Sequence, residues 1–141
     1  MGPKPANCPS WVPDTPDGND NDINYGALDD YGYLEELPEG ETIRNRVTYL
    51  SNNTINKRLG IVKYGILTIK GTTTLEGYSQ IRVCEGGTLI VDGGTLQNAD
   101  IILVPGCTVI IRHNGKINMA SGKEFQAPVG AVVNIESGEI N

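Results

Sequence analysis

Three oxygen-bearing side chains in the acidic N-terminal part of the chain have the spacing of a calcium-binding loop. Asp20, Asp22 and Asn24 occupy alternate positions, as do the ligands at positions 1, 3 and 5 of such loops. The pattern then departs from a calcium loop, because position 6 is Tyr25 instead of glycine and position 12 is Tyr31 instead of glutamate. Two alternatives stay open, a weak calcium site and a solvated acidic linker, and no other cofactor is indicated.

The charged side chains after residue 60 do not form a recognisable catalytic set. The single histidine, His113, stands in a turn-like sequence, and nothing in the pattern indicates a nucleophile or carboxylate beside it. Asp92 stands at a corner and Asp100 before a strand, while Arg82 and Arg112 alternate with apolar residues and should point outward. We therefore predict a protein that is not an enzyme and has no catalytic residue, with His113 as an exposed turn residue.

The three cysteines do not indicate a metal site. Cys8, Cys84 and Cys107 lie far apart and lack the short spacings that metal ligands show. One disulfide with a free thiol and three inert thiols are both compatible with the sequence. The disulfide pairing therefore stays open.

Threonines recur in the strand-like segments and suggest one polar face. This row of threonines comprises Thr68, Thr72, Thr73, Thr74, Thr88, Thr95 and Thr108. It would suit contact with a flat polar surface or a glycan, or it reflects the ordinary β propensity of threonine on a solvated face. Asn52 begins an Asn-x-Thr sequence that has the form of a glycosylation site, and we read it as a polar turn between strands.

Charge and hydropathy exclude two classes of function. The net charge is −6, and residues 5–43 contain ten acidic residues and no Lys or Arg, so the acidity belongs to the N-terminal part. The rest of the chain is mildly basic but has no concentrated basic face, which argues against nucleic-acid binding. No apolar run approaches a membrane span, and no signal peptide is recognisable.

Residues 1–42 form one compositional unit. Five of the eight prolines fall within the first sixteen positions, and an Asp- and Asn-rich run follows them. Little apolar material is available to offset the entropy of ordering this segment, so we expect an irregular, extended or disordered structure. Its aromatic residues, among them Trp11, Tyr31 and Tyr33, instead suggest a cap over one end of a repeat fold. Whether the segment is ordered stays open.

An internal repeat decides the fold of residues 43–141. Four segments share an apolar-x-apolar strand, a polar or glycine corner and a second short strand, and their matched positions are Leu67, Leu89, Val109 and Val133. The spacings between these positions are 22, 20 and 24 residues. The same apolar positions must return once per coil in a coiled repeat but not in an antiparallel sandwich. The weakest strand-like piece is Lys123–Ala127.

The predicted fold is all-β: a right-handed parallel β-helix, or β-solenoid, of about three to four coils with an irregular N-terminal segment. Each coil should contain about three short strands that bond to the coils above and below. We expect glycines to turn the corners through positive φ, at Gly71, Gly93, Gly94, Gly115 and Gly138. The residues expected to point inward are Leu67, Ile69, Leu75, Ile81, Val83, Leu89, Val91, Leu96, Ile101 and Leu103.

The glycine-rich rhythm of these coils resembles a known class of proteins. The segment from Glu85 to Leu96 reads Glu-Gly-Gly-Thr-Leu-Ile-Val-Asp-Gly-Gly-Thr-Leu. It is similar to the rungs of secreted bacterial right-handed parallel β-helix proteins, which are pectin-lyase-like solenoids, and among them to the adhesin-like type. The resemblance covers roughly residues 43–141 and implies an extracellular or cell-surface protein. A lyase of this superfamily would need clustered carboxylates binding calcium, and no column of aspartates builds up here.

The sequence supports one function and leaves two alternatives. We expect an exported, non-catalytic structural or adhesin-type module that presents a surface for carbohydrate or protein contact, so that a glycan or a surface protein is its partner. The first alternative is a fragment of a polysaccharide-acting β-helix enzyme. The second is a solenoid that self-assembles as a homo-oligomer through an uncapped C-terminal coil, because the sequence stops just after a rung pattern. Which ligand is bound, the oligomeric state and whether the chain is part of a longer protein stay open.

Overall fold

The described part of the chain consists of β-strands and the turns between them. The computed structural model describes residues 22–25, 34–37, 40–43, 46–56, 58–77 and 79–141. Within these ranges there is no helix. Among them there is accordingly no helix of the length and apolarity needed to cross a membrane.

The strands form three sheets that wrap around one interior. Sheet A contains β1 (Asp22–Tyr25), β4 (Arg46–Tyr49), β7 (Ile66–Ile69), β10 (Thr88–Asp92), β13 (Thr108–Arg112) and β15 (Val132–Ile135) in that order. Sheet B contains β2 (Leu34–Leu37), β3 (Gly40–Ile43), β6 (Arg58–Ile61), β9 (Gln80–Val83) and β12 (Ile101–Leu103). Sheet C contains β5 (Asn53–Ile55), β8 (Thr72–Leu75), β11 (Thr95–Ala99), β14 (Gly115–Met119) and β16 (Gly138–Ile140).

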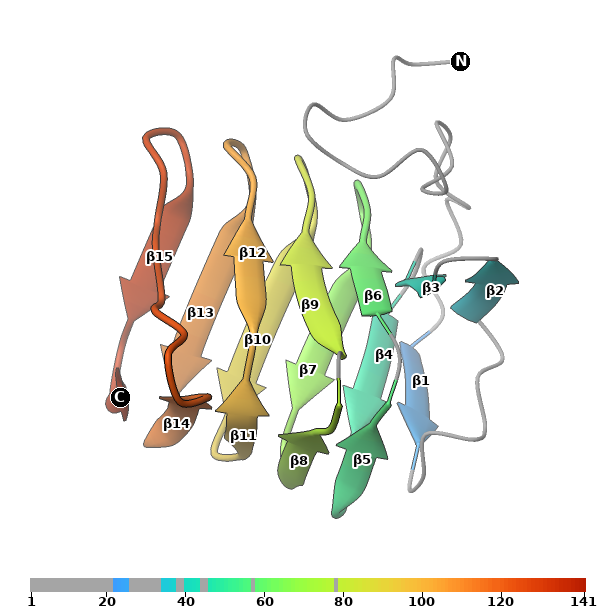
Figure 1. Ribbon diagram of the computed structural model, residues 1–141, viewed down its shortest axis with the longest axis horizontal. Coiled ribbons are helices and arrows are strands. Elements are labelled where there is room, and N and C mark those ends of the chain that lie inside the picture. The colour runs from blue at the N-terminus through green and yellow to red at the C-terminus, as the bar shows by residue number, and fades with distance from the viewer. Residues whose placement is uncertain (1–21, 26–33, 38–39, 44–45, 57, 78) are drawn as a thin grey trace.

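The chain visits the three sheets in rotation, which confirms the predicted β-solenoid. All pairings are parallel except that of β2 with β3, and the stack has about four turns. In Figure 1, β6, β9 and β12 run upward in front and β7, β10 and β13 run downward behind. The chain meanwhile advances to the left, so the coil is right-handed.

The predicted register of the repeat is confirmed. Leu89 pairs with Leu67 on one side and with Val109 on the other, and Val109 pairs with Val133. The same column continues to Val47, the register partner of Leu67. The coils differ in length, but the extra residues lie at the corners, so the strands stay aligned.

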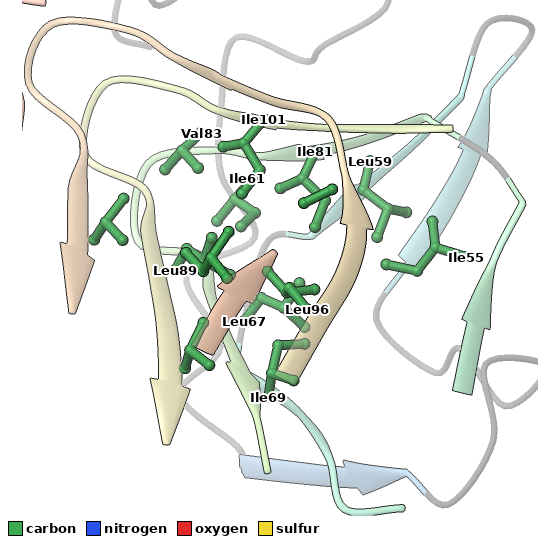
Figure 2. Packing of buried hydrophobic residues seen from close by; sticks show 14 of the residues in the cluster. Ile55, Leu59, Ile61, Leu67, Ile69, Ile81, Val83, Leu89, Leu96 and Ile101 are labelled. Atoms are coloured by element: carbon green, nitrogen blue, oxygen red, sulfur yellow. The ribbon is translucent and has the colours of Figure 1, made fainter. Parts of the chain in front are cut away.

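The interior of the stack is apolar. Every residue predicted to point inward is buried, the most exposed being Leu103 at 7%. Side chains from all three sheets meet in this interior, as the cluster around Leu67, Leu89 and Leu96 shows (Figure 2). Each fully buried aliphatic side chain contributes roughly 1.5–3 kcal/mol. One coil alone cannot enclose such a core, so the coils stabilise one another by stacking.

The corner glycines are required for two different reasons. Gly93 has a φ of +71°, as predicted for a corner turned by glycine. The prediction of positive φ is wrong for Gly71, Gly94 and Gly115, which lack it. At Gly94 a Cβ atom would lie 2.5 Å from the carbonyl oxygen of Gly71, and at Gly115 it would lie 2.5 Å from that of Val91. These positions need glycine because the coil beneath leaves no space for a side chain.

The predicted strand at Lys123–Ala127 does not form. The segment between Ala99 and Gly106, which contains β12, comprises residues 100–105, whereas the equivalent segment of the next coil comprises residues 121–129. Because of its extra residues, this segment does not run beside β12 at the distance of a hydrogen-bonded strand. Pro128 also lacks the N–H that a continuing ladder needs.

Some expectations fall outside the described residues. Trp11, Tyr31 and Tyr33, which suggested a cap, lie there. Before residue 43, β1 joins sheet A and β3 joins sheet B through parallel pairing with β4 and β6.

Candidate functional site

The outer face of sheet A has an uncharged band that is two side chains wide. Because inward and outward residues alternate along a strand, the register aligns the outward residues into columns. One column is formed by Ile66, Thr88 and Thr108, and its neighbour by Thr68, Ile90 and Ile110. We call these six residues the outer band. All six are half-buried, because neighbours about 4.8 Å apart in a column cover one another.

A column of alternating charge borders the outer band. Asp92 and Arg112 are register partners, and the Nε atom of Arg112 lies 3.3 Å from Oδ2 of Asp92. Ile69 and Val91 are register partners, so the residues that follow them, Lys70 and Asp92, are neighbours in the column. Ile111 and Ile135 are also register partners, so Glu136 is the neighbour of Arg112 on the other side of the column. The sequence of charges is therefore positive, negative, positive, negative, and adjacent coils attract one another when they stack in this register.

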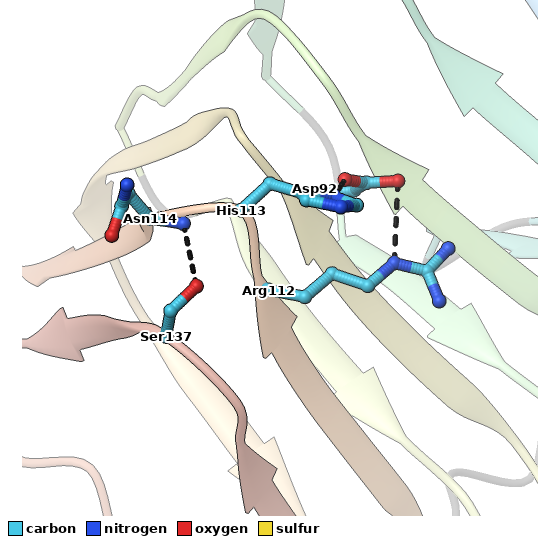
Figure 3. Close-up of polar contacts among 5 residues, drawn as sticks. All are labelled: Asp92, Arg112, His113, Asn114 and Ser137. Carbon is cyan, nitrogen blue, oxygen red and sulfur yellow. Dashed lines mark hydrogen bonds and ion pairs between the residues drawn. The ribbon is translucent and has the colours of Figure 1, made fainter.

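His113 completes the charged corner. Its Nδ1 contacts Oδ1 of Asp92, on the side of that carboxylate not used by Arg112 (Figure 3). The hydrogen bond from His113 lowers the pKa of Asp92; partial burial opposes this, and the charge of Arg112 adds to the lowering. The Asp92 side chain is only 12% exposed, whereas that of His113 is 74% exposed.

The backbone of this corner is unusual. His113 and Asn114 have φ values of 54° and 61°, and two successive residues with positive φ are the signature of a type I′ turn. The N–H of Asn114 donates to Oγ of Ser137 in the next coil, at 3.0 Å. Figure 3 shows Ser137 on the opposite side of the corner from Asp92. The corner thus links three successive coils, and it does not align Ser137, His113 and Asp92 as a nucleophile, base and orienting acid.

Sequence reasoning placed His113 correctly in an exposed turn but found no carboxylate beside it. The missed partner, Asp92, is 21 residues away. The sequence contained the information needed to find this partner, because aligning Leu89 with Val109 also places Asp92 opposite Arg112, next to His113.

The outer face of sheet C is a polar ladder. Asn118 donates from Nδ2 to Oε1 of Gln97 at 2.9 Å, and Asn141 donates from Nδ2 to Oδ1 of Asn118 at 2.8 Å. Lys116 and Glu139 form an exposed ion pair at 3.9 Å in the neighbouring column. Such exposed contacts contribute little stability individually, but they help to fix which coil positions face one another.

Arg82 and Asp100 belong to a third polar group on sheet B. Nε2 of Gln80 donates to Oδ2 of Asp100 at 3.3 Å, and Nη2 of Arg82 donates to Oε1 of Gln80 at 3.3 Å. Lys123 lies 3.6 Å from the same carboxylate oxygen of Asp100. These residues contact one another along the sheet and do not converge with the corner at Asp92.

The predicted threonine row is divided between two sheets. Thr68, Thr88 and Thr108 lie on the outer face of sheet A. The threonines of sheet C that point outward are Thr72, Thr74 and Thr95. Thr73 is not part of any outer face, because it pairs with inward-pointing Leu96 and is fully buried. Thr72, Thr73 and Thr74 are identical in type, so the sequence pattern could not show which of them points inward.

The calcium hypothesis stays a prediction. Asp20 lies outside the described residues, and Asp22 and Asn24 lie in β1 opposite Arg46 and Thr48. Nothing in the described ranges brings three or more His, Cys, Asp or Glu side chains together as a metal site. Of the Asn-x-Thr sequence, which was predicted to be a polar turn, only Asn52 lies exposed between β4 and β5, whereas Asn53 and Thr54 lie within β5.

The cysteines agree with the alternative of one disulfide and one free thiol. Cys84 is disulfide-bonded, and Cys107 is a free, buried thiol. Burial raises the pKa of the Cys107 thiol. Cys8 lies outside the described residues.

No protein-family model, curated protein or solved structure matches the chain. The structure shows a parallel β-solenoid, and the resemblance to pectin-lyase-like solenoids stays a prediction.

Proposed function

We propose that this protein is an exported, non-catalytic β-solenoid module whose outer band binds the flat face of a neutral carbohydrate polymer. The observation that carries the proposal is the composition of the outer band, where six half-buried Thr and Ile side chains lie side by side without a charge among them. Sugar rings present C–H faces and hydroxyl groups together. Ile side chains offer apolar contact to the first, and Thr hydroxyls donate to and accept from the second.

The rigidity of the band favours binding. Its backbone is fixed by parallel ladders on both sides, and its side chains are held by neighbours above and below. Few rotamers are lost when such side chains meet a flat partner, which lowers the entropic cost of association. The same regularity gives the band a repeat of about 4.8 Å from coil to coil.

The charged corner supports a structural and not a catalytic role in this proposal. The Asp92 carboxylate contacts Arg112 and His113 across two coils, and the His113 side chain is 74% exposed, whereas catalytic groups are typically gathered in an enclosed pocket. Export is supported by the disulfide at Cys84, because disulfides persist in oxidising compartments. The adhesin-like and bacterial character rests on the resemblance of the rungs.

A sedimentation assay with insoluble polysaccharides tests the proposal. Cellulose and chitin are incubated with the full chain, and the protein left in the supernatant is measured. The variant T88K/T108K places two charges in the outer band, and T72K/T95K, which places two charges on register partners of sheet C, is the matched control. We expect retention of the wild type and T72K/T95K and loss of T88K/T108K. Equal behaviour of both variants contradicts the proposal, and release of soluble sugars favours the enzyme alternative.

A second candidate function, self-assembly through the last coil, has a specific observation in its favour. Ile135 continues the inward column of Ile111 yet is 47% exposed, and Val132 is 56% exposed. A second copy stacked on β15 and β16 would cover these side chains and pair their strand edges. Concentration-dependent mass in analytical ultracentrifugation that is abolished by I135E would favour assembly, and a monomer at all concentrations would reject it.

A further inference from the structure

Sheet B ends one coil before the other two sheets. Sheet A continues from β13 to β15 and sheet C from β14 to β16, but no described strand follows β12. The N–H of Ala120 donates to the carbonyl oxygen of Ala99, and the N–H of Gly106 donates to that of Gly130, both at 2.9 Å. Between these two bonds, no backbone hydrogen bond joins β12 to the described segment 121–128. β12 is therefore an open strand edge.

The open edge has specific hydrogen-bonding groups. The carbonyl of Asp100 and the N–H of Val104 both bond to β9. Successive residues of a parallel strand direct their backbone groups to opposite sides. Ile101 and Leu103 therefore direct their N–H and C=O groups away from β9, toward segment 121–128. Both residues are at least 93% buried, and buried backbone groups require hydrogen-bond partners.

A cavity adjoins this edge. Its volume is about 370 Å³, and it is lined by Ile101, Ile102, Leu103, Glu124, Gln126, Ala127 and Pro128. Figure 1 shows the segment between β14 and β15 passing alongside β12. The cavity is thus a slot between a strand edge and a loop. We call it the β12 slot.

The lining of the β12 slot indicates the chemistry of an occupant. Ile102 is 37% exposed beside it, which offers an apolar surface to the aliphatic stem of a long side chain at the adjacent position. Glu124 receives a hydrogen bond from Nε2 of Gln126 at 3.3 Å, and no cation of the described ranges pairs with it. A basic side chain in the occupant would complement this carboxylate.

We propose that the β12 slot binds an extended peptide that adds to sheet B as one further strand. Only an extended backbone offers alternating N–H and C=O groups at the spacing that Ile101 and Leu103 present. A peptide with apolar residues at alternate positions and one Lys or Arg between them fits the slot. The site lies on a different sheet from the outer band, so peptide binding is independent of carbohydrate binding.

The probe is a dye-labelled peptide that copies β9 and its flanking residues, Ser79–Cys84, with Thr in place of Cys84, so that its sequence is Ser-Gln-Ile-Arg-Val-Thr. Fluorescence anisotropy with the full chain should show saturable binding. Two N-methylated forms test the backbone pairing, one methylated at Arg and Thr and the other at Ile and Val. In a parallel ladder with Ile opposite Ile101, the N–H groups of Arg and Thr donate to the carbonyl oxygens of Ile101 and Leu103, and those of Ile and Val face away. We expect methylation at Arg and Thr to weaken binding about tenfold or more, as expected for two lost hydrogen bonds, and the other form to bind nearly as the parent.

A charge exchange tests the role of Glu124. The variant E124K should weaken binding of the parent peptide and restore binding of a peptide with Glu in place of Arg. E139K, which changes an exposed carboxylate on sheet C, is the control and should bind as the wild type. Absence of saturable binding, equal binding of both N-methylated forms, or insensitivity to E124K would each overturn the proposal. Self-association of the protein without peptide binding would assign the edge to a second copy and would overturn it as well.

Discussion

Asp92 lies in register with Arg112 of the next coil, and the two side chains form an ion pair of 3.3 Å at the corner between sheets A and C. His113 contacts the other oxygen of the same carboxylate. The pair joins one coil to the next at the border of the outer band, so its contribution to stability depends on the stacking register itself.

The ionisation of Asp92 should make the stability of the protein depend on pH. Its folded-state pKa is lowered from the ordinary value of 3.8, so its stabilising contribution is fully present above that value. The contribution is lost as pH falls through the lower folded pKa. We expect D92N to reduce the free energy of unfolding by about 1 kcal/mol at neutral pH, the scale of one partly buried, hydrogen-bonded ion pair.

Urea unfolding of wild type and D92N between pH 7 and pH 2 measures this contribution. The difference in unfolding free energy should be constant near neutrality and shrink below the ordinary pKa of Asp92. In the background R112Q/H113N, which lacks both partners, D92N should have a much smaller effect. A difference that persists unchanged at the lowest pH would contradict the assignment of the lowered pKa.

The close approach of coils at the corners makes Gly94 sensitive to the smallest substitution. In G94A the new methyl group would lie 2.5 Å from the carbonyl oxygen of Gly71, which forces the backbone to move and should cost about 2 kcal/mol or more. G77A is the matched control, because Gly77 has a φ of +59° but no atom within 4 Å of the new Cβ. It should cost about 1 kcal/mol through φ alone. Urea midpoints compare the two, and equal losses would contradict the packing argument.

A core residue between two coils should contribute more to the free energy of unfolding than one in the last coil. Leu89 is fully buried between two coils, so L89A should cost about 2–5 kcal/mol. Ile140, in the last strand, is only partly buried against the core, and I140A should cost distinctly less. Chemical denaturation measures both. A larger loss for I140A would contradict the view that interior coils are supported from both sides.

The free thiol of Cys107 should be unreactive in the native protein. It is fully buried, and its raised pKa leaves even less of the reactive thiolate at mild pH. Without reductant, Ellman's reagent should detect almost no thiol until denaturant is added. Rapid labelling under native conditions would show that the interior near β13 opens readily.

The sequence predicted the stacking more accurately than the faces of the stack. Leu67, Leu89, Val109 and Val133 marked the register because an enclosed apolar column tolerates few substitutions, so its pattern repeats visibly. Outer faces have no such constraint. Thr73 resembles its neighbours in type, and only pairing with Leu96 determines that it points inward.

Contacts between coils were also harder to predict than the strands themselves. The Asp92–His113 contact connects residues 21 positions apart, and it follows only when the register is extended from the strands into the corners. The segment 123–127 has alternating apolar residues, but the length of its loop overrides that local preference.

The most direct test of the proposed function is a titration of isoleucine-labelled protein followed by methyl NMR, with soluble oligosaccharides of the retained polymer as ligand. The proposal predicts shift changes at the δ1-methyl groups of Ile66, Ile90 and Ile110, which line the outer band. The methyl groups of Ile102 on sheet B and Ile135 in the last coil should be unaffected. Changes at Ile102 or Ile135 with none in the outer band would contradict the proposal.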